Sequence, residues 1–328
     1  MLYKDNEDIV TIGVDIGGTK IEAALVDKNG KIIVSQKSAT NAEKGVDAVI
    51  TNLVQCIKVC LDNSEHMTGS IGIGMAGQID RDSGTIRSSP NLGWKDIPLK
   101  NKLEQLFEIP VVITNDVRAA TWGEWKYGAG KGARDLVCLF VGTGIGGGII
   151  SGGNILEGYL NTAGELGHIT IVKDGRQCHC RNQGCLEAYA GGWAIAERAK
   201  EAVQADPEAG SYLVNLAGDI QNISSITVTQ AYTERDPLAQ RLVKETAEYL
   251  AAGIVGIVNA INPCLMILGG GVIHGLPDYI EMVKPIIYSN ALQVAVEQLH
   301  VVIASLGNKA GVIGAASLAR DQIVSIDQ

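Results

Sequence analysis

One local pattern occurs in each half of the chain: an apolar strand, a turn of glycines with a threonine, and a second strand. In the first half, the apolar residues 10–14 run into DIGGT at 15–19, and a strand is expected at 21–26. In the second half, residues 135–141 run into GTGIGGG at 142–148, and a strand is expected at 149–151. Turn signals at 29–30 and 152–154 then predict a hairpin in each half. The repetition indicates an internal duplication of a supersecondary unit.

Strands and helices alternate through the rest of the chain. Further strands are expected at 31–35, 70–74, 110–114, 264–268 and 301–304, with a hairpin over 81–85. Apolar residues at helical spacing predict helices at 45–62, 98–106, 118–123, 192–204, 237–261 and 310–319. Such alternation is typical of an α/β protein with helix-covered sheets, and 328 residues favour two domains.

The composition of the chain argues against nucleic-acid and membrane partners and indicates a reduced cellular compartment. The net charge of −9 argues against a nucleic-acid surface, which needs a basic patch. Residues 1–8 are polar and acidic, so no signal peptide is expected, and the longest apolar stretch, 250–261, is too short to span a membrane. Four of the seven cysteines lie in apolar helix or strand patterns, which fits a reduced, cytoplasmic compartment.

Both Gly/Thr turns are candidates for phosphate binding. A tight turn between strands points several backbone N–H groups at one place, and Thr19 and Thr143 add hydroxyl donors. The alternative is that each turn only joins a hairpin. Two matched turns, one in each half, favour the phosphate interpretation over the alternative.

Asn115 and Asp116 follow a predicted strand and precede a predicted helix. An aspartate there can accept the proton of a hydroxyl that attacks a phosphoryl group. The alternative is a helix N-cap, where Asn and Asp are favoured.

A metal site is predicted from one histidine and three clustered cysteines: His168, Cys178, Cys180 and Cys185. Zinc commonly takes four N or S ligands in tetrahedral geometry. His179 is a competing ligand, although adjacent Cys-His-Cys side chains converge with difficulty. A disulfide or a redox pair is the alternative for the cysteines.

Two glutamates flank this cluster. Glu165 and Glu187 suit a ring of sugar hydroxyls, because carboxylates accept hydrogen bonds from hydroxyl donors, and the alternative is two surface glutamates. The triple glycine at 269–271 leaves room for a flat ring, or else marks a close contact between a strand and a helix.

Together these motifs resemble the ROK sugar kinases, and among them the glucokinases, from about residue 9 to 316. The resemblance is carried by DIGGTK at 15–20, GTGIGGG at 142–148 and LGGG at 268–271. It is carried most specifically by GELGH at 164–168 with CHC at 178–180 and GCLE at 184–187. LG at 306–307 and AGVIGAA at 310–316 resemble the C-terminal helix of the family.

The resemblance implies a two-domain α/β fold of the actin/hexokinase (ribonuclease H-like) class with an inter-domain cleft. The smaller domain is expected at residues 1–117 plus about 305–328, and the larger domain, with the zinc knuckle, at 118–304. It also implies ATP-dependent phosphorylation of a hexose at the 6-hydroxyl, with glucose preferred, by a cytoplasmic homodimer or dimer of dimers. ATP with Mg²⁺ and one structural Zn²⁺ per chain are the implied cofactors.

The resemblance also assigns roles to residues, with Asp116 as the catalytic base. Substrate contacts are expected from Gly77, Asn91, Asn115, Asp116, Glu165, His168 and Glu187. Nucleotide contacts are expected from Asp15, Gly17, Gly18, Thr19, Lys20, Gly142, Thr143, Gly144, Gly269, Gly270 and Gly271. The zinc ligands are expected to be His168, Cys178, Cys180 and Cys185.

Four residues depart from the family pattern: Arg118, His179, Arg181 and Lys309. Kinases of fructose, mannose, N-acetylglucosamine or N-acetylmannosamine share nearly all these motifs, and polyphosphate is an alternative donor. A sugar-responsive regulator is the rival from another class. Such proteins carry a DNA-binding region before the first turn, where this chain has only fourteen residues.

Overall fold

A computed structural model describes residues 9–276 and 278–326. The segment 1–8, on which the signal-peptide expectation rests, lies outside these residues. The chain divides into two compact units. Unit 1 comprises residues 1–132, 155–163 and 305–328, and unit 2 comprises 133–154 and 164–304. Residues 118–132 and 155–163 therefore belong to unit 1, whereas the sequence-based division put them in the larger domain.

Unit 1 is built on a five-stranded sheet with the order β3-β2-β1-β4-β8. Its strands are β1 (Val10–Ile16), β2 (Lys20–Val26), β3 (Ile32–Ala39), β4 (Thr68–Met75) and β8 (Val111–Asn115). A small second sheet contains β5 (Gln78–Ile79), β6 (Ile86–Ser89) and β7 (Trp94–Ile97). The helices are α1 (Val46–Asp62), α2 (Leu99–Phe107), α3 (Asp116–Tyr127) and α12 (Ala310–Ile326), with short 3₁₀ turns η1 (Ala42–Lys44), η2 (Pro90–Leu92) and η5 (Gly307–Lys309).

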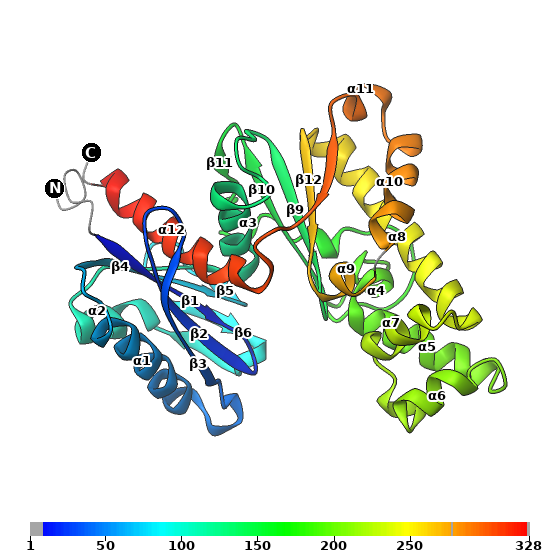
Figure 1. The fold of residues 1–328 in the computed structure, drawn as a ribbon, viewed down its shortest axis with the longest axis horizontal. Helices are drawn as coiled ribbons and strands as arrows, with labels where there is room; N and C mark the ends of the chain where they lie inside the picture. Colours follow the sequence, from blue (N-terminus) through cyan, green and yellow to red (C-terminus); the bar gives the residue numbers. More distant parts are fainter. Residues whose placement is uncertain (1–8, 277, 327–328) are drawn as a thin grey trace. The chain divides into compact units, whose positions relative to one another are not determined.

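Helices cover both faces of this sheet, as Figure 1 shows for α1 and α12. Helix α1 packs its apolar side, including Leu53 and Ile57, on one face. Helix α12 lies so close to the other face that a Cβ on Gly13 or Gly72 would meet its backbone at 1.8 or 1.9 Å. Glycine in these strand interiors is therefore required by close helix–sheet packing.

Unit 2 repeats the same sheet order, β11-β10-β9-β12-β13. Its strands are β9 (Leu136–Val141), β10 (Ile145–Ser151), β11 (Asn154–Ile155), β12 (Leu265–Gly269) and β13 (His300–Ile303). Its helices are α4 (Glu187–Ala190), α5 (Gly192–Ala205), α6 (Ser211–Ala217), α7 (Ser225–Thr233), α8 (Pro237–Ile261), α9 (Gly271–Gly275), α10 (Tyr279–Asn290) and α11 (Gln293–Val296), with 3₁₀ turns η3 (Leu166–His168) and η4 (Ile220–Asn222). None of the helices in the described residues has the length and apolar character needed to cross a bilayer.

The predicted duplication is confirmed by strand pairing. In each unit the first strand pairs antiparallel with the next strand and parallel with a later one: β1 with β2 and β4, and β9 with β10 and β12. The turn expected over 142–148 was predicted too long, because β10 already begins at Ile145. Within that strand, Gly147 is required by close packing. A Cβ on Gly147 would lie 2.6 Å from Leu166 and 2.7 Å from the carbonyl oxygen of Gly164.

Candidate active site

The parallel strands of unit 1 bring its acidic residues to one edge of the sheet. Strands β1, β4 and β8 are parallel, so their carboxyl ends meet. Asp15 lies near the end of β1, Gly77 follows β4, and Asp116 follows β8. Ligands of open α/β sheets bind outside the carboxyl ends of the strands, which makes this edge a candidate site.

Asp116 is a half-buried residue whose carboxylate makes few hydrogen bonds. Its Oδ1 accepts from the N–H of Val117 at 2.9 Å, and burial raises the pKa of the carboxyl above its ordinary value of 3.8. A raised pKa makes a carboxylate a better proton acceptor, as a general base requires.

Asp15 is the second perturbed carboxyl of unit 1. Burial first, and then the charge of Asp116, raise the pKa of Asp15 to about 6, and Lys20 opposes the rise. A Cβ on Gly311 would stand 3.2 Å from the Asp15 carboxylate oxygen, so α12 approaches this group closely. A carboxyl whose pKa is raised by burial and by a neighbouring carboxylate marks a site suited to a proton or a cation.

Asn115 performs the helix-capping role that was the alternative for this pair. Its Oδ1 accepts from the N–H of Arg118 at 3.1 Å, which caps α3. Asp116 is the first helical residue and does not cap the helix. The cap fixes the direction of the first turn of α3 and thus the place of the Asp116 carboxylate.

The first Gly/Thr turn is exposed and held by its backbone. Gly17 donates to the carbonyl of Lys20 at 2.9 Å, while the Thr40 hydroxyl donates to the Gly17 carbonyl at 2.7 Å. Gly18 lies 3.7 Å, measured from an added Cβ, from Asn91. The turn therefore presents open backbone on a fixed frame, with Asn91 nearby, as an anion site needs.

The second Gly/Thr turn is tied to the start of α5. Gly142 donates to the Gly144 carbonyl at 2.9 Å. Gly192 donates to the Gly142 carbonyl and Trp193 to the Thr143 carbonyl, each also at 2.9 Å. These bonds fix the turn against the N-terminal end of α5, which bears partial positive charge from the helix dipole.

Glu187 joins this turn to the cysteine-rich segment. Its Oε2 accepts from the N–H of Ile145 at 2.8 Å, and its Oε1 accepts from the Trp193 indole at 3.2 Å. Gly144 has room for no side chain here, because an added Cβ would lie 2.4 Å from the Glu187 carboxylate. Glu165, by contrast, is exposed just before η3.

The four expected metal ligands converge. Their ligand atoms all lie within 4.8 Å of one another, with Cys178 Sγ 3.7 Å from His168 Nδ1 and Cys180 Sγ 3.6 Å from Cys185 Sγ. Zinc bonds of about 2.3 Å to sulfur and 2.0 Å to nitrogen place tetrahedral ligand atoms about 3.5–3.8 Å apart. The donor set and its spacing fit zinc.

The competing ligand, His179, lies outside this set. Its ring stacks on Trp193, with centroids 4.1 Å apart and planes at 26°. Arg181 adopts a φ of 79°, a left-handed conformation that favours glycine. That conformation explains why glycine is common there in the family that the sequence resembles.

The glycines at 269–271 divide in role. An added Cβ on Gly269 would meet Phe140 at 2.8 Å, and one on Gly270 would meet the Val141 carbonyl at 2.3 Å. Both glycines are required by close packing against β9, and not by the contact with a helix that was the alternative for this motif. Gly271 faces open space at the start of α9.

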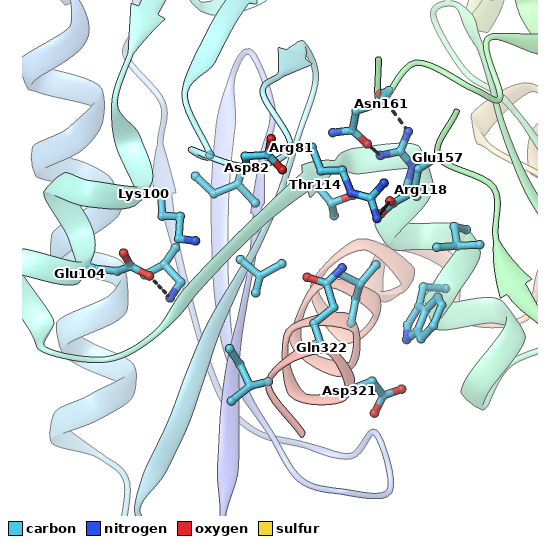
Figure 2. A pocket seen from close by; sticks show the side chains of 18 residues that line it. Arg81, Asp82, Lys100, Glu104, Thr114, Arg118, Glu157, Asn161, Asp321 and Gln322 are labelled. Atoms are coloured by element: carbon cyan, nitrogen blue, oxygen red, sulfur yellow. Dashed lines mark hydrogen bonds and ion pairs between the residues drawn. The ribbon is translucent and has the colours of Figure 1, made fainter. Parts of the chain in front are cut away.

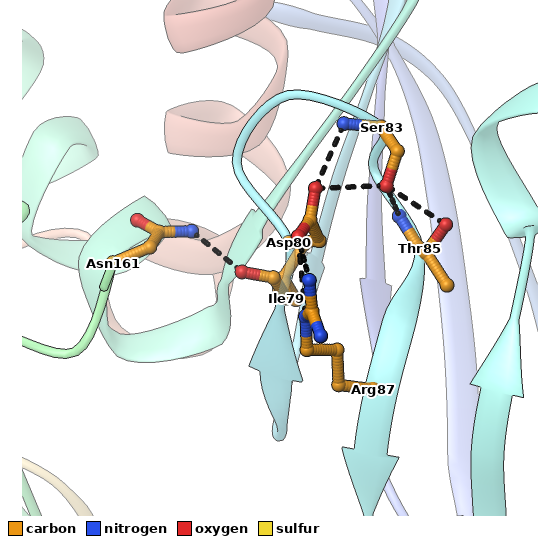
Figure 3. Close-up of polar contacts among 6 residues, drawn as sticks. All are labelled: Ile79, Asp80, Ser83, Thr85, Arg87 and Asn161. Atoms are coloured by element: carbon orange, nitrogen blue, oxygen red, sulfur yellow. Dashed lines mark hydrogen bonds and ion pairs between the residues drawn. The ribbon is translucent and has the colours of Figure 1, made fainter.

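A pocket of about 530 Å³ opens in unit 1 beside β8, lined by Thr114, Arg118 and Trp122 among others (Figure 2). The Arg118 guanidinium donates to the side chain and the carbonyl of Asn161, and Figure 3 shows the Asn161 amide donating in turn to the Ile79 carbonyl. Arg118 thus holds the segment 155–163 to α3.

Lys309 also has a structural explanation. Its ammonium pairs with Glu22, whose side chain is only 1% exposed. Lys20 and Lys37 lie 3.7 and 3.4 Å from the same carboxylate. Although burial opposes it, this cationic surrounding lowers the pKa of Glu22. The long-range pairs of Arg118 and Lys309 left no local pattern in the sequence.

Known proteins share this fold and sequence. The model of the ROK family matches residues 11–322. The glucokinase of Streptomyces coelicolor is 39% identical over 320 residues, which cover 95% of this chain and 98% of that protein. A crystal structure of a ROK family glucokinase from Streptomyces griseus in complex with glucose and AMPPNP has a TM-score of 0.82 at 37% identity, covering 95% of this chain and 99% of that one.

A second branch of relatives consists of regulators. The xylose repressor of Caldicellulosiruptor bescii is 29% identical to this chain. The match covers 100% of this chain and 82% of the repressor. The extent of the family match and the identity to the glucokinases leave one conclusion: this chain belongs to the ROK family, with the α/β fold of its sugar kinases.

Proposed function

We propose that this protein transfers the γ-phosphoryl group of ATP to the 6-hydroxyl of glucose. The observation that carries the proposal is a half-buried carboxylate of raised pKa, Asp116, at the end of β8, in a chain that matches ROK glucokinases over nearly their whole length. The identity to glucokinases exceeds that to the repressors by ten percentage points, which favours the kinase over the regulator.

The chemistry follows from a weak nucleophile and a charged leaving group. As the sugar oxygen bonds to the γ-phosphorus, the bond from phosphorus to ADP breaks and the hydroxyl proton passes to Asp116. The two Gly/Thr turns donate backbone N–H groups to phosphate oxygens. Mg²⁺, which Asp15 would help to hold, supplies positive charge that offsets the charge of the phosphates.

In this proposal the sugar hydroxyls other than the 6-hydroxyl are assigned to Gly77, Asn91, Asn115, Glu165, His168 and Glu187. The nucleotide is assigned to Asp15, Gly17, Gly18, Thr19, Lys20, Gly142, Thr143, Gly144, Gly269, Gly270 and Gly271, of which Gly271 is the most open of the last three. One structural Zn²⁺ is assigned to His168, Cys178, Cys180 and Cys185.

A cytoplasmic location and a homodimer complete the proposal. Three close thiols stay available to a metal ion only where disulfides do not form, as in the cytoplasm. Light scattering of the purified protein measures the oligomeric state directly, and a monomeric mass would remove the dimer from the proposal.

An ADP-release assay over a panel of sugars tests the function. The panel contains glucose, fructose, mannose, N-acetylglucosamine and N-acetylmannosamine, each with ATP as donor. With polyphosphate as donor the sugar phosphate itself is measured, because that reaction releases no ADP. We expect the highest kcat/KM for glucose with ATP, and glucose 6-phosphate as the product. The Asp116→Asn protein, assayed in parallel, controls for contaminating kinases. Absence of sugar-dependent ADP release with every sugar would refute the kinase and favour sugar sensing.

A further inference from the structure

Trp193 connects three segments of unit 2 and has so far been assigned no role. Its backbone N–H donates to the Thr143 carbonyl at 2.9 Å, in the second Gly/Thr turn. Its indole N–H donates to Glu187 Oε1 at 3.2 Å, and its ring stacks on His179. Trp193 thus contacts the second Gly/Thr turn through its backbone, and Glu187 and His179 of the cysteine-rich segment through its side chain.

Glu187 depends on this contact for its orientation. Its other oxygen is fixed by the Ile145 N–H at 2.8 Å, so the two bonds together set the rotation of the carboxylate. A carboxylate offers about four acceptor positions, and these bonds use two, which leaves acceptors for sugar hydroxyls. Losing the indole bond leaves Glu187 anchored through one oxygen only.

His179 provides the link to the metal ligands. It stands between Cys178 and Cys180, so the conformation of that segment sets the place of its ring. The nearly parallel stack at 4.1 Å presses the imidazole on the indole face and limits the rotation of Trp193. The tryptophan is half-buried, and the stack covers part of its ring.

We propose that Trp193 is a positioning residue for the sugar-binding carboxylate of Glu187, and that His179 transmits the state of the zinc knuckle to it. This inference rests on the proposed role of Glu187 in sugar binding. In this proposal the metal site affects sugar affinity through a series of contacts. The backbone of the knuckle places the His179 ring, this ring stacks on Trp193, and the Trp193 indole N–H donates to the Glu187 carboxylate.

A double-mutant cycle tests the chain of contacts by steady-state kinetics. Trp193→Phe keeps a stacked ring but removes the donor, and we expect roughly a tenfold higher KM for glucose, the size of one hydrogen bond to a charged group, with kcat nearly unchanged. In the Glu187→Gln background the same substitution should add little, because its effect passes through the carboxylate. Additive effects, or a fall in kcat with KM unchanged, would overturn the proposal.

Two further variants keep the result decisive if Trp193→Phe folds poorly. His179→Ala should raise the KM for glucose about two- to fourfold, as one lost aromatic contact does, and His179→Phe should restore it. Equal KM values for both His179 variants and the wild type would refute the link. The matched control is Trp122→Phe, which loses an indole bond of 3.3 Å to Ser317 in unit 1 and should leave the KM unchanged.

Fluorescence separates this inference from the function on which it rests. Removal of zinc by a chelator should change tryptophan emission in the wild type and in Trp122→Phe but far less in Trp193→Phe. An undiminished change in Trp193→Phe would overturn the link. If Glu187→Gln leaves the KM for glucose unchanged, the role of Glu187 in sugar binding fails instead, whatever the Trp193 variant does.

Discussion

The two Gly/Thr turns have the same strand frame but different chemistry. Ile16 pairs with Ile21 to close the first turn, and Val141 pairs with Ile145 to close the second. By this register Asp15 of unit 1 corresponds to Phe140 of unit 2. The first turn therefore lies beside half-buried acidic residues, whereas the second turn has an aromatic residue at the same position and contacts a carboxylate from another segment, that of Glu187. In the proposed function, the duplicated strand frame positions the backbone that binds phosphate, the acidic residues near the first turn transfer the proton, and Glu187 near the second turn binds sugar.

The largest effect is expected from a substitution of the acidic residue Asp116 in unit 1. Asp116→Asn removes the proton acceptor but keeps the shape of the side chain. We expect kcat to fall roughly 10²–10⁴-fold, the usual contribution of a general base, with glucose binding largely kept. Turnover comes from the ADP-release assay and binding from calorimetry. Near-normal turnover would show that Asp116 is not the base.

The next effect breaks the metal site near the second turn. Cys180→Ser removes one ligand, and we expect loss of the bound zinc and a KM for glucose raised roughly 10–100-fold, the scale on which metal-site contacts affect activity. Metal analysis accompanies the kinetics. The matched control is Cys264→Ser, an exposed cysteine outside the metal ligands. An active wild-type protein without zinc would contradict this prediction.

Two alanine substitutions test how the second turn positions Glu187. In Gly144→Ala the new Cβ would lie 2.4 Å from the Glu187 carboxylate, whereas in Gly142→Ala it meets nothing within 4 Å. Displacing Glu187 should raise the KM for glucose roughly tenfold, about the loss of one bond to a charged group. Gly142→Ala should change it less than Gly144→Ala does. Equal effects of the two substitutions would contradict the packing argument.

The smallest effect concerns stability at the first turn. Burial raises the pKa of Asp15 from 3.8 to about 6, so its charged form destabilises the folded state. This cost is absent below about pH 4, grows as the pH rises through 6, and is then constant. Asp15→Asn should therefore increase stability to urea by about 1–2 kcal/mol at pH 7.5 and by nothing near pH 4. An equal change at both pH values would contradict the assigned cause.

Sequence patterns predicted the strands, helices and turns better than they predicted the contacts between distant segments. The two turns, most strands and helices such as α8 follow from local periodicity and glycine placement, which the chain dictates residue by residue. His168 was predicted as the ligand from the sequence, with His179 as the competing candidate. The structure places His168 with the three cysteines and His179 on Trp193. The pairs of Arg118 with Asn161 and of Lys309 with Glu22 join distant segments, so no local signal marks them.

The pH dependence of kcat/KM for glucose tests the proton transfer to Asp116 most directly. Since burial raises the pKa of Asp116, the base is protonated and inactive at acidic pH and becomes active as the pH rises through that raised value. We expect kcat/KM to fall tenfold per pH unit on the acid side, with an apparent pKa above the ordinary aspartate value of 3.8. Product is measured directly by phosphorus NMR, and full activity on return to pH 7.5 excludes unfolding. A rate that does not change from pH 4 to pH 8 would contradict a carboxylate base at this position.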